Sequence, residues 1–172
     1  MSFSIAEARM FGFTPYLPAA FAPSKLEICR DTYEQNRHRV YSLAFWMTDN
    51  ELAAEELMIE AFTQAFARSE QPSADTIDRA LISALRELLP LGSLTLNCAP
   101  AQQVLSVRRN TMRVDLERAV VQLPSTEKLM FLMHDVEGYD YARIARLLGM
   151  SQDDSQNGVH QARLRMRELL AK

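Results

Sequence analysis

Apolar and polar residues follow the period of an amphipathic helix along most of this chain. In residues 53–66, apolar side chains recur as adjacent pairs four positions apart, which places them on one broad helical face. A similar pattern in residues 26–47 predicts a helix before it. Residues 24–27, Ser-Lys-Leu-Glu, form a capping box that satisfies the first backbone amides of a helix, so we expect the first helix to begin there.

Two further boundaries follow from local signals. Residues 48–51, Thr-Asp-Asn-Glu, read as a second capping box that opens the helix over residues 53–66. A third helix is expected over about residues 74–89, where Pro90 ends it. Residues 90–103 lack clear periodicity and contain Gly92 and Pro100, which indicates a linker.

Helical periodicity returns in the last third of the chain, over residues 113–122, 125–135, 140–148 and 152–171. The fold class predicted is therefore all-α, with two small helical domains joined by a linker. The division expected is an N-terminal extension at 1–23, a first helical domain at 24–89, a linker at 90–112 and a second helical domain at 113–172.

The best-defined local motif lies in residues 140–151, Asp-Tyr-Ala-Arg-Ile-Ala-Arg-Leu-Leu-Gly-Met-Ser. Asp140 can cap a short helix, and Gly149 can end it in the left-handed conformation that glycine adopts without steric cost. Ser151 can cap the next helix with Asp154 as its acidic partner, and Ala145 is small where two helices cross closely. This arrangement predicts a helix-turn-helix, although an ordinary helical hairpin has the same spacing.

Composition narrows the class of protein. With 48% hydrophobic and 24% charged residues in 172, the chain reads as globular rather than disordered. The formal net charge of −3 does not by itself indicate nucleic-acid binding. The apolar stretch over residues 1–23 is interrupted by Glu7 and Arg9 and has no basic start, so we expect neither a secretory signal nor membrane insertion.

The sequence shows none of the residue patterns that are typical of catalytic or metal sites. Cys29 and Cys98 belong to no C-x-x-C pair, which favours reduced thiols and a cytoplasmic location. His38, His134 and His160 are scattered without metal-ligand spacing. With no glycine-rich phosphate loop or nucleophile–base pair, we expect no catalytic residues, metal or cofactor, and a protein that is not an enzyme.

Two blocks of the chain resemble the extracytoplasmic-function (ECF) type of RNA polymerase sigma factors. Residues 33–41 and 49–62 are similar to the start of region two of that family. Residues 115–124, 131–141, 144–149 and 162–170 are similar to region four, and the blocks occur in the family's order. The resemblance implies three partners, which are the RNA polymerase core, promoter DNA and an anti-sigma factor.

The resemblance also implies two binding helices. The helix at residues 49–66 matches the one that docks on polymerase, where Ile59 replaces the family's usual glutamine. The polymerase-binding positions implied are Glu55, Glu56, Ile59, Glu60 and Phe62. The helix after the turn matches the one that reads the upstream promoter element. Its implied DNA-binding residues are Ser151, Gln152, Ser155, Gln156, Asn157, His160, Gln161, Arg163 and Arg167.

The chain departs from this pattern where DNA would lie. Residues 153–158 are Asp-Asp-Ser-Gln-Asn-Gly, where the family usually has Gly-Thr-Val-Lys-Ser-Arg. Asp153 and Asp154 favour the positive end of the helix dipole but repel phosphates, and Gly158 lowers helix propensity. His160 and the arginines after it remain as possible donors, or as a solvated, dipole-stabilising face.

The segment at about residues 74–107 matches the family's promoter-melting element, but it also lacks features that this element usually carries. Residues 80–90 hold no aromatic side chain on which an unstacked base could rest. Trp46 lies within an apolar helix instead and is expected in the core. Two functions therefore stay open: a working sigma factor, or a sigma-like regulator that binds an anti-sigma factor or polymerase without recognising promoters.

Overall fold

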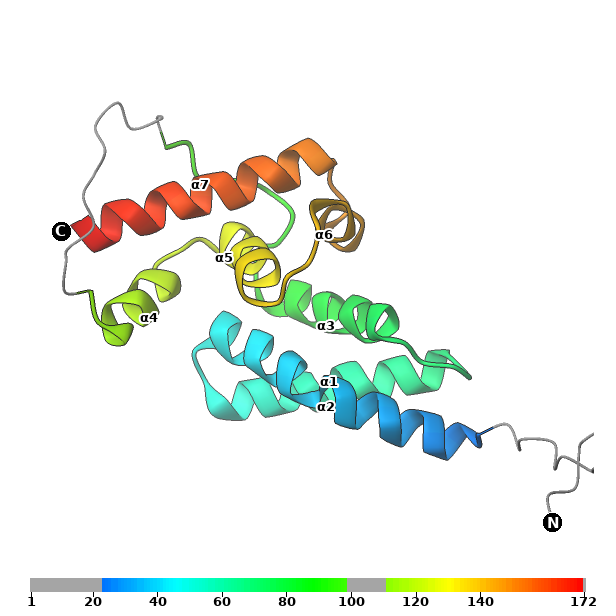
Figure 1. The fold of residues 1–172 in the computed structure, drawn as a ribbon. Coiled ribbons are helices and arrows are strands. Elements are labelled where there is room, and N and C mark those ends of the chain that lie inside the picture. The colour runs from blue at the N-terminus through cyan, green and yellow to red at the C-terminus, as the bar shows by residue number, and fades with distance from the viewer. Residues whose placement is uncertain (1–22, 99–110, 172) are drawn as a thin grey trace, which may run out of the picture.

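The computed structural model describes residues 23–98 and 111–171, and these residues form helices without any β-strand (Figure 1). The predicted all-α class is confirmed. The first group of helices is α1 (Lys25–Thr48), α2 (Glu51–Arg68) and α3 (Ala74–Leu88). The second group is α4 (Arg113–Val121), α5 (Ser125–Phe131), α6 (Tyr141–Leu148) and α7 (Gln152–Ala171). The expected extension at residues 1–23 lies outside the described residues except for its last position.

The predicted start of α1 is confirmed by its cap. The backbone amide of Glu27 donates to the Ser24 hydroxyl over 3.3 Å, and the Ser24 amide donates to the Glu27 carboxylate over 2.8 Å. Those hydrogen bonds from Ser24 lower the pKa of Glu27 below its ordinary value. The pair is fully exposed, so its role is to define where the helix begins.

The capping box predicted at Thr48 is wrong. Thr48 is still part of α1, and its hydroxyl donates to the Ala44 carbonyl at 2.9 Å. Asp49 then ends α1 in the left-handed conformation, with φ of 53°. Asn50 is the actual cap of α2, because its side-chain oxygen accepts the Ala53 amide at 3.0 Å. Helix α2 therefore begins two residues later than the pattern Thr-x-x-Glu suggested.

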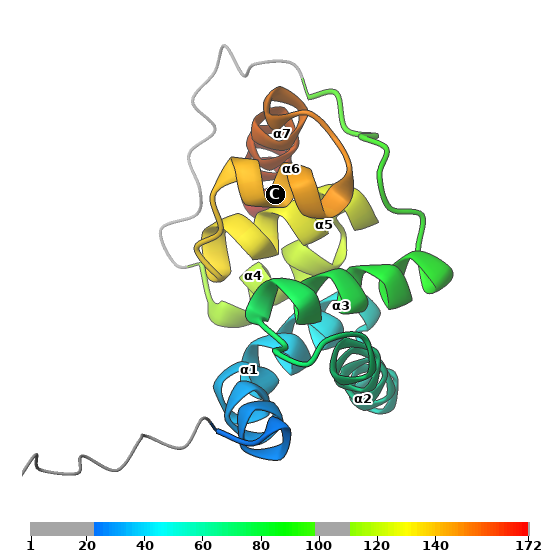
Figure 2. The same ribbon diagram turned by 90° about the vertical axis from the view of Figure 1, so that its right-hand side faces the viewer.

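Helix α3 is the helix of the first group that faces the second group, and it lies between that group and helices α1 and α2 (Figure 2). It ends at Leu88, with Leu89 extended before Pro90, close to the predicted boundary. Apolar side chains are buried around most of its circumference, because α2 covers one side and the second group covers another. As a result the buried core runs continuously from α1 and α2 through α3 into α5, α6 and α7.

The helix predicted over residues 125–135 changes its winding midway. An α-helical part, α5, passes into a π-helical turn at Leu132–Val136. The Glu137 amide bonds to the Leu132 carbonyl at 3.0 Å, and the Tyr139 amide bonds to the Met133 carbonyl at 2.9 Å. This widened turn sets the position of Tyr139 ahead of α6.

The described part of the predicted linker packs against the second group. Leu91, Leu94 and Leu96 lie against the core. The carboxylate of Glu127, a residue of α5 with no exposed surface, accepts the amides of Thr95 and of Leu96, the latter at 2.7 Å. Residues 91–98 are therefore part of the packed structure, not a free tether.

Two other sequence expectations concern the surface. Trp46 is half-buried rather than central in the core, and it lines a groove between the end of α1 and α4. Within residues 23–98 and 111–171, no helix combines the length and apolar character needed to cross a bilayer.

Candidate functional site

The helix-turn-helix predicted at residues 140–171 is present. The Asp140 carboxylate caps α6 by accepting the Arg143 amide at 2.6 Å. Gly149 has φ of 73°, and the amides of Gly149 and Met150 both donate to the Ala145 carbonyl, over 2.8 and 3.0 Å. This pair of hydrogen bonds to one carbonyl, at a glycine in the left-handed conformation, ends α6 and turns the chain into α7.

The start of α7 is also capped as predicted. The Ser151 hydroxyl accepts the Asp154 amide at 3.0 Å and donates to the Asp154 carboxylate at 2.6 Å. Asp153 and Asp154 lie in the first helical turn, where the helix dipole favours negative charge. Both are exposed, so the end of α7 that would approach phosphates carries two acids.

The residues predicted to bind DNA fall on two different sides of α7. Five of them are exposed around its first turns, namely Ser151, Gln152, Gln156, Asn157 and His160. Their side chains offer neutral hydrogen-bonding groups of the kind that read base edges. These five stay a prediction as DNA contacts, on a surface that is accessible.

Ser155 is the predicted DNA contact that the structure contradicts. Its side chain is fully buried, so it faces the core and not a ligand. Its hydroxyl has no hydrogen-bond partner among the described residues. The position lies on the inward stripe of α7 with Val159 and Ala162, four and seven residues later.

Gly158 lies on that inward side as well. A Cβ atom there would collide with the Met130 sulfur and lie 2.9 Å from a methyl carbon of Leu94. The glycine thus lets α5 and the linker approach α7 closely. The position at which the family usually has an arginine therefore faces inward in this chain.

The remaining predicted contacts are further along α7. The Gln161 side-chain oxygen accepts the Cys98 amide at 2.7 Å, which ties it to the linker. Arg163 makes a two-pronged ion pair with Asp135, one arm measuring 2.9 Å, and these hydrogen bonds raise its pKa. Arg167 is exposed and has no ion pair within the described part of the chain. Only Arg167 of the two predicted arginines is therefore unengaged.

The predicted polymerase-binding helix, α2, presents a mixed face. Glu55, Glu56 and Glu60 are exposed around Ile59, whose side chain is 62% exposed. Phe62 is the exception, because only 4% of it is exposed; its ring packs edge-on against Tyr33 at 4.8 Å between centroids. Phe62 is thus a core residue of the first group, and its predicted contact with polymerase is wrong in this conformation.

A groove between α1 and α2 borders this face. Tyr33 and Tyr41 line it from α1, and Glu55, Met58 and Ile59 line it from α2. The exposed isoleucine therefore stands beside a hollow whose walls combine aromatic and apolar side chains with the polar groups of Arg37, His38 and Glu55.

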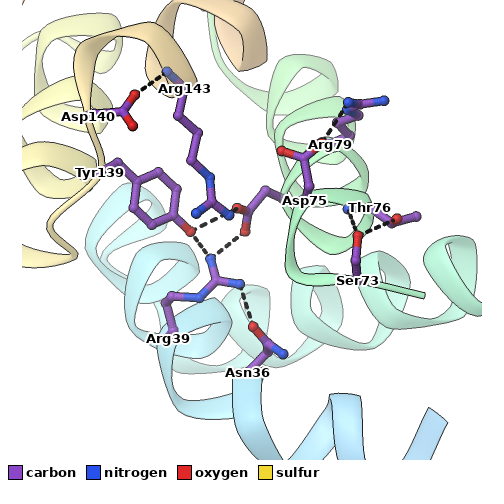
Figure 3. Close-up of polar contacts among 10 residues, drawn as sticks. Asn36, Arg39, Ser73, Asp75, Thr76, Arg79, Tyr139, Asp140 and Arg143 are labelled. Carbon is purple, nitrogen blue, oxygen red and sulfur yellow. Dashed lines mark hydrogen bonds and ion pairs between the residues drawn. The ribbon is translucent and has the colours of Figure 1, made fainter. Parts of the chain in front are cut away.

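A buried polar cluster joins the two groups of helices and was not anticipated from the sequence (Figure 3). Asp78 of α3 accepts hydrogen bonds from Arg39, from the Tyr139 hydroxyl at 2.8 Å and from Arg143 at 2.7 Å. The Arg143 guanidinium also lies over the Tyr139 ring, 4.1 Å from its centroid. Burial raises the pKa of the Tyr139 hydroxyl above its ordinary value, and the nearby Asp78 carboxylate adds to the shift.

Helix α3 touches the helix-turn-helix at a second point. Arg86 donates to the Leu148 carbonyl at the end of α6, over 2.6 Å. One helix of the first group therefore contacts α6 near its start, through Asp78, and at its end, through Arg86.

The family described as sigma-70, region 4 matches residues 113–166, which contain α4, α5, α6 and most of α7. An ECF RNA polymerase sigma factor, SigE of Mycolicibacterium smegmatis, is 25% identical over 170 residues, which cover 89% of this chain and 64% of SigE. The positive control factor of Bacillus subtilis is 30% identical over 115 residues, which cover 63% of this chain and 65% of that protein. The chain thus spans about two thirds of the length of these two relatives.

A solved structure shares the fold. It is the sigma factor RpoE from Bartonella quintana in complex with the anti-sigma factor NepR, with a TM-score of 0.59 at 16% identity, covering 82% of this chain and 95% of that one. The match spans both helical groups, whereas the region 4 match is confined to the second. Residues 113–166 thus match the sigma-70 region 4 family, and the chain as a whole is similar in sequence to an ECF-type RNA polymerase sigma factor and in fold to a solved sigma factor.

Proposed function

We propose that this chain is a sigma factor that directs transcription initiation by binding core RNA polymerase and promoter DNA in the cytoplasm. The observation that carries the proposal is the capped helix-turn-helix within residues matched by region 4. The first helical group precedes it in the order found in sigma factors. The activity is one of binding and positioning, without catalysis by this chain.

Helix α2 is the proposed polymerase contact. Ile59 supplies an apolar centre, and the carboxylates of Glu55, Glu56 and Glu60 surround it. Protein interfaces combine an apolar, fully desolvated centre with a polar rim in this way. Leu52, which is 67% exposed on the same helix, extends the apolar area.

The first turns of α7 are the proposed DNA contact. Gln156 and Asn157 are exposed there, and amide side chains can pair with both the N6 and N7 groups of adenine in the major groove. His160 is exposed one turn further on, and Arg167 is placed for a phosphate. With two acids nearby, recognition would depend on polymerase to supply most of the affinity.

The polymerase contact is tested with a pair of matched substitutions. Ile59→Asp places a charge at the centre of the proposed interface and should weaken binding to core polymerase by about 2 kcal/mol, or roughly 30-fold. Leu26→Asp makes the same chemical change at a leucine that is 80% exposed on α1 and should leave affinity unchanged. Equal affinities for the two variants would overturn the assignment to α2.

The promoter contact is tested by selecting duplex sequences from a random library with the chain and core polymerase together. A specific sequence should be enriched only when both are present. Asn157→Ala should then weaken binding to the selected site by about 1–3 kcal/mol, while Gln122→Ala, at an exposed amide that follows α4, should not. A failure to enrich any sequence would exclude a working sigma factor.

The second candidate function is a sigma-like regulator that binds an anti-sigma factor, or polymerase, without recognising promoters. The exposed Asp153 and Asp154 at the tip of α7 favour it, because a basic protein surface would meet them more readily than DNA would. Intact polymerase binding with no enriched sequence, or capture by an anti-sigma factor alone, would select this function over the first.

A further inference from the structure

The Asp78 carboxylate sits in a set of donors that suits any oxyanion. Two guanidinium groups and one phenol hydroxyl point at it, and its side chain is only 3% exposed. Charge-assisted bonds from arginine form equally well with carboxylates and phosphates, because both present paired oxygens to the planar fork.

Two of the three donors belong to the helix-turn-helix group. Arg143 lies in the first turn of α6, and Tyr139 immediately precedes that helix. In helix-turn-helix proteins the first helix crosses the DNA backbone, and arginine and tyrosine side chains commonly donate to phosphate oxygens there. The Tyr139 hydroxyl is protonated at neutral pH, as phenols ordinarily are, and so is available as a donor.

Asp78 leaves part of this donor set unused. It engages one terminal nitrogen of Arg143, and the buried Nε of the same guanidinium has no hydrogen-bond partner among the described residues. A ligand with a second oxygen in reach of Nε would bind Arg143 in the two-pronged manner that one nitrogen alone does not allow.

We propose that Asp78 is an internal substitute for a DNA phosphate, bound at an anion site formed by Tyr139 and Arg143. The site passes from Asp78 to a backbone phosphate when α3 moves away from α6. This inference rests on the proposed function only in placing the helix-turn-helix on DNA. It adds a phosphate contact and a reason why the closed arrangement binds DNA weakly.

The competition is strong because Asp78 is carried on the same chain and is always near the site. Of the other arginines on α7, Arg163 is held by Asp135 and Arg165 by Glu168, whereas Arg167 is exposed. Release of Asp78 therefore changes both the geometry and the charge of the DNA-binding group.

The test uses random-sequence duplex DNA, without polymerase, and measures affinity by fluorescence anisotropy over a series of salt concentrations. Asp78→Asn should raise affinity roughly tenfold and steepen the dependence of log affinity on log salt by about 0.9, the value of one phosphate contact. Asp75→Asn is the matched control. It removes the same charge from the same helix, at a partly exposed residue paired with Arg79 over 2.6 Å, and should not steepen the dependence.

A second substitution assigns the gain to the proposed site. Arg143→Gln in the Asp78→Asn background should return the salt dependence to that of the unsubstituted protein. Arg143→Gln alone should change DNA affinity less than twofold, because Asp78 already occupies that arginine. Equal effects of Arg143→Gln in both backgrounds would overturn the proposal.

Asp78→Asn leaves two arginines without their buried partner, so its circular dichroism and thermal unfolding are recorded first. If it fails to fold, Asp78→Ser, which keeps a hydrogen-bonding group beside the arginines, takes its place. In the folded variant the Nε–H signal of Arg143, followed by nuclear magnetic resonance, should shift in a saturable manner as duplex DNA is added, and an unmoved signal would refute the site.

The outcome is separable from that of the proposed function. Gain of random-sequence binding by Asp78→Asn, in a chain for which no promoter is ever enriched, would support the anion site and reject the sigma-factor role. Enrichment of a promoter by a chain whose Asp78→Asn and Asp75→Asn variants behave alike would do the reverse.

Discussion

Helices α2 and α7 both carry exposed acids, yet they present different chemistry. On α2 the glutamates surround exposed apolar side chains, Leu52 and Ile59. On the first turns of α7, Asp153 and Asp154 stand among neutral polar groups, with no exposed large apolar side chain. The acids of α2 form the rim of an apolar patch, whereas those of α7 dominate its tip.

The difference indicates that acidity alone does not decide what a surface binds. A carboxylate beside a desolvated apolar centre is compatible with a protein partner. The same carboxylate beside a phosphate backbone is repulsive and has to be offset by cations elsewhere. The α2 surface therefore has the composition of a protein-binding surface, while the α7 surface would need cations from outside its first turns to bind DNA.

The largest effect on the comparison of the two helices is expected from a substitution at Gly158 of α7. Gly158→Arg forces a long side chain against Met130 and Leu94, so the free energy of unfolding should fall by about 3 kcal/mol. Asn157→Arg, one residue earlier and exposed, should leave stability nearly unchanged and raise DNA affinity. Chemical denaturation and DNA titration of the pair measure both effects. A stable Gly158→Arg variant with raised DNA affinity would contradict the inward placement of this residue.

A smaller effect is expected at Ser155, on the same inward side. Ser155→Ala removes a buried hydroxyl that has no partner among the described residues, so the free energy of unfolding should rise by about 1 kcal/mol. DNA affinity should not change, because the side chain does not reach the surface. Ser151→Ala provides the contrast, since loss of that cap should destabilise α7 by about 1 kcal/mol.

The smallest effect concerns the acids themselves. Asp153→Asn removes repulsion from the tip of α7, and DNA affinity should rise about threefold at low salt and less at high salt. Stability should fall by a few tenths of a kcal/mol, as the dipole of α7 loses a favourable charge. Glu87→Gln, at an exposed acid near the end of α3, should produce neither change. An equal gain from Glu87→Gln would mean that net charge, and not the α7 tip, limits binding.

Features determined by neighbouring residues were predictable from the sequence. Ser24, Asp140, Gly149 and Ser151 cap or end helices through bonds that span three to five residues, so their roles follow from local pattern. The prediction at Thr48 was wrong because two residues able to cap a helix lie within three positions, and Asn50 is the one that caps α2. The scaffold of the helix-turn-helix was therefore recoverable, as was the likeness to region 4.

Features determined by distant residues were not. Asp78 and Tyr139 are 61 positions apart, and nothing in either neighbourhood marks them as partners. Phe62 and Ser155 did carry a signal, since each lies on its helix's inward stripe. For Phe62, matching to family positions took precedence over that spacing. The role of Gly158 could not be predicted from α7 alone, because it depends on the close approach of Leu94 from the linker and of Met130 from α5.

The hydrogen bonds between Glu127 and the linker bear on where the second group of helices begins as a folding unit. The region 4 match starts at residue 113, but a fragment cut there would lose the amides of Thr95 and Leu96 that donate to a fully buried carboxylate. Loss of the hydrogen bonds to a buried polar group costs about 1–3 kcal/mol, a large part of the stability of a small domain. It would also expose the surface beside Gly158 that Leu94 covers. The autonomous unit is therefore longer than the homologous one, and its first essential residue precedes Thr95.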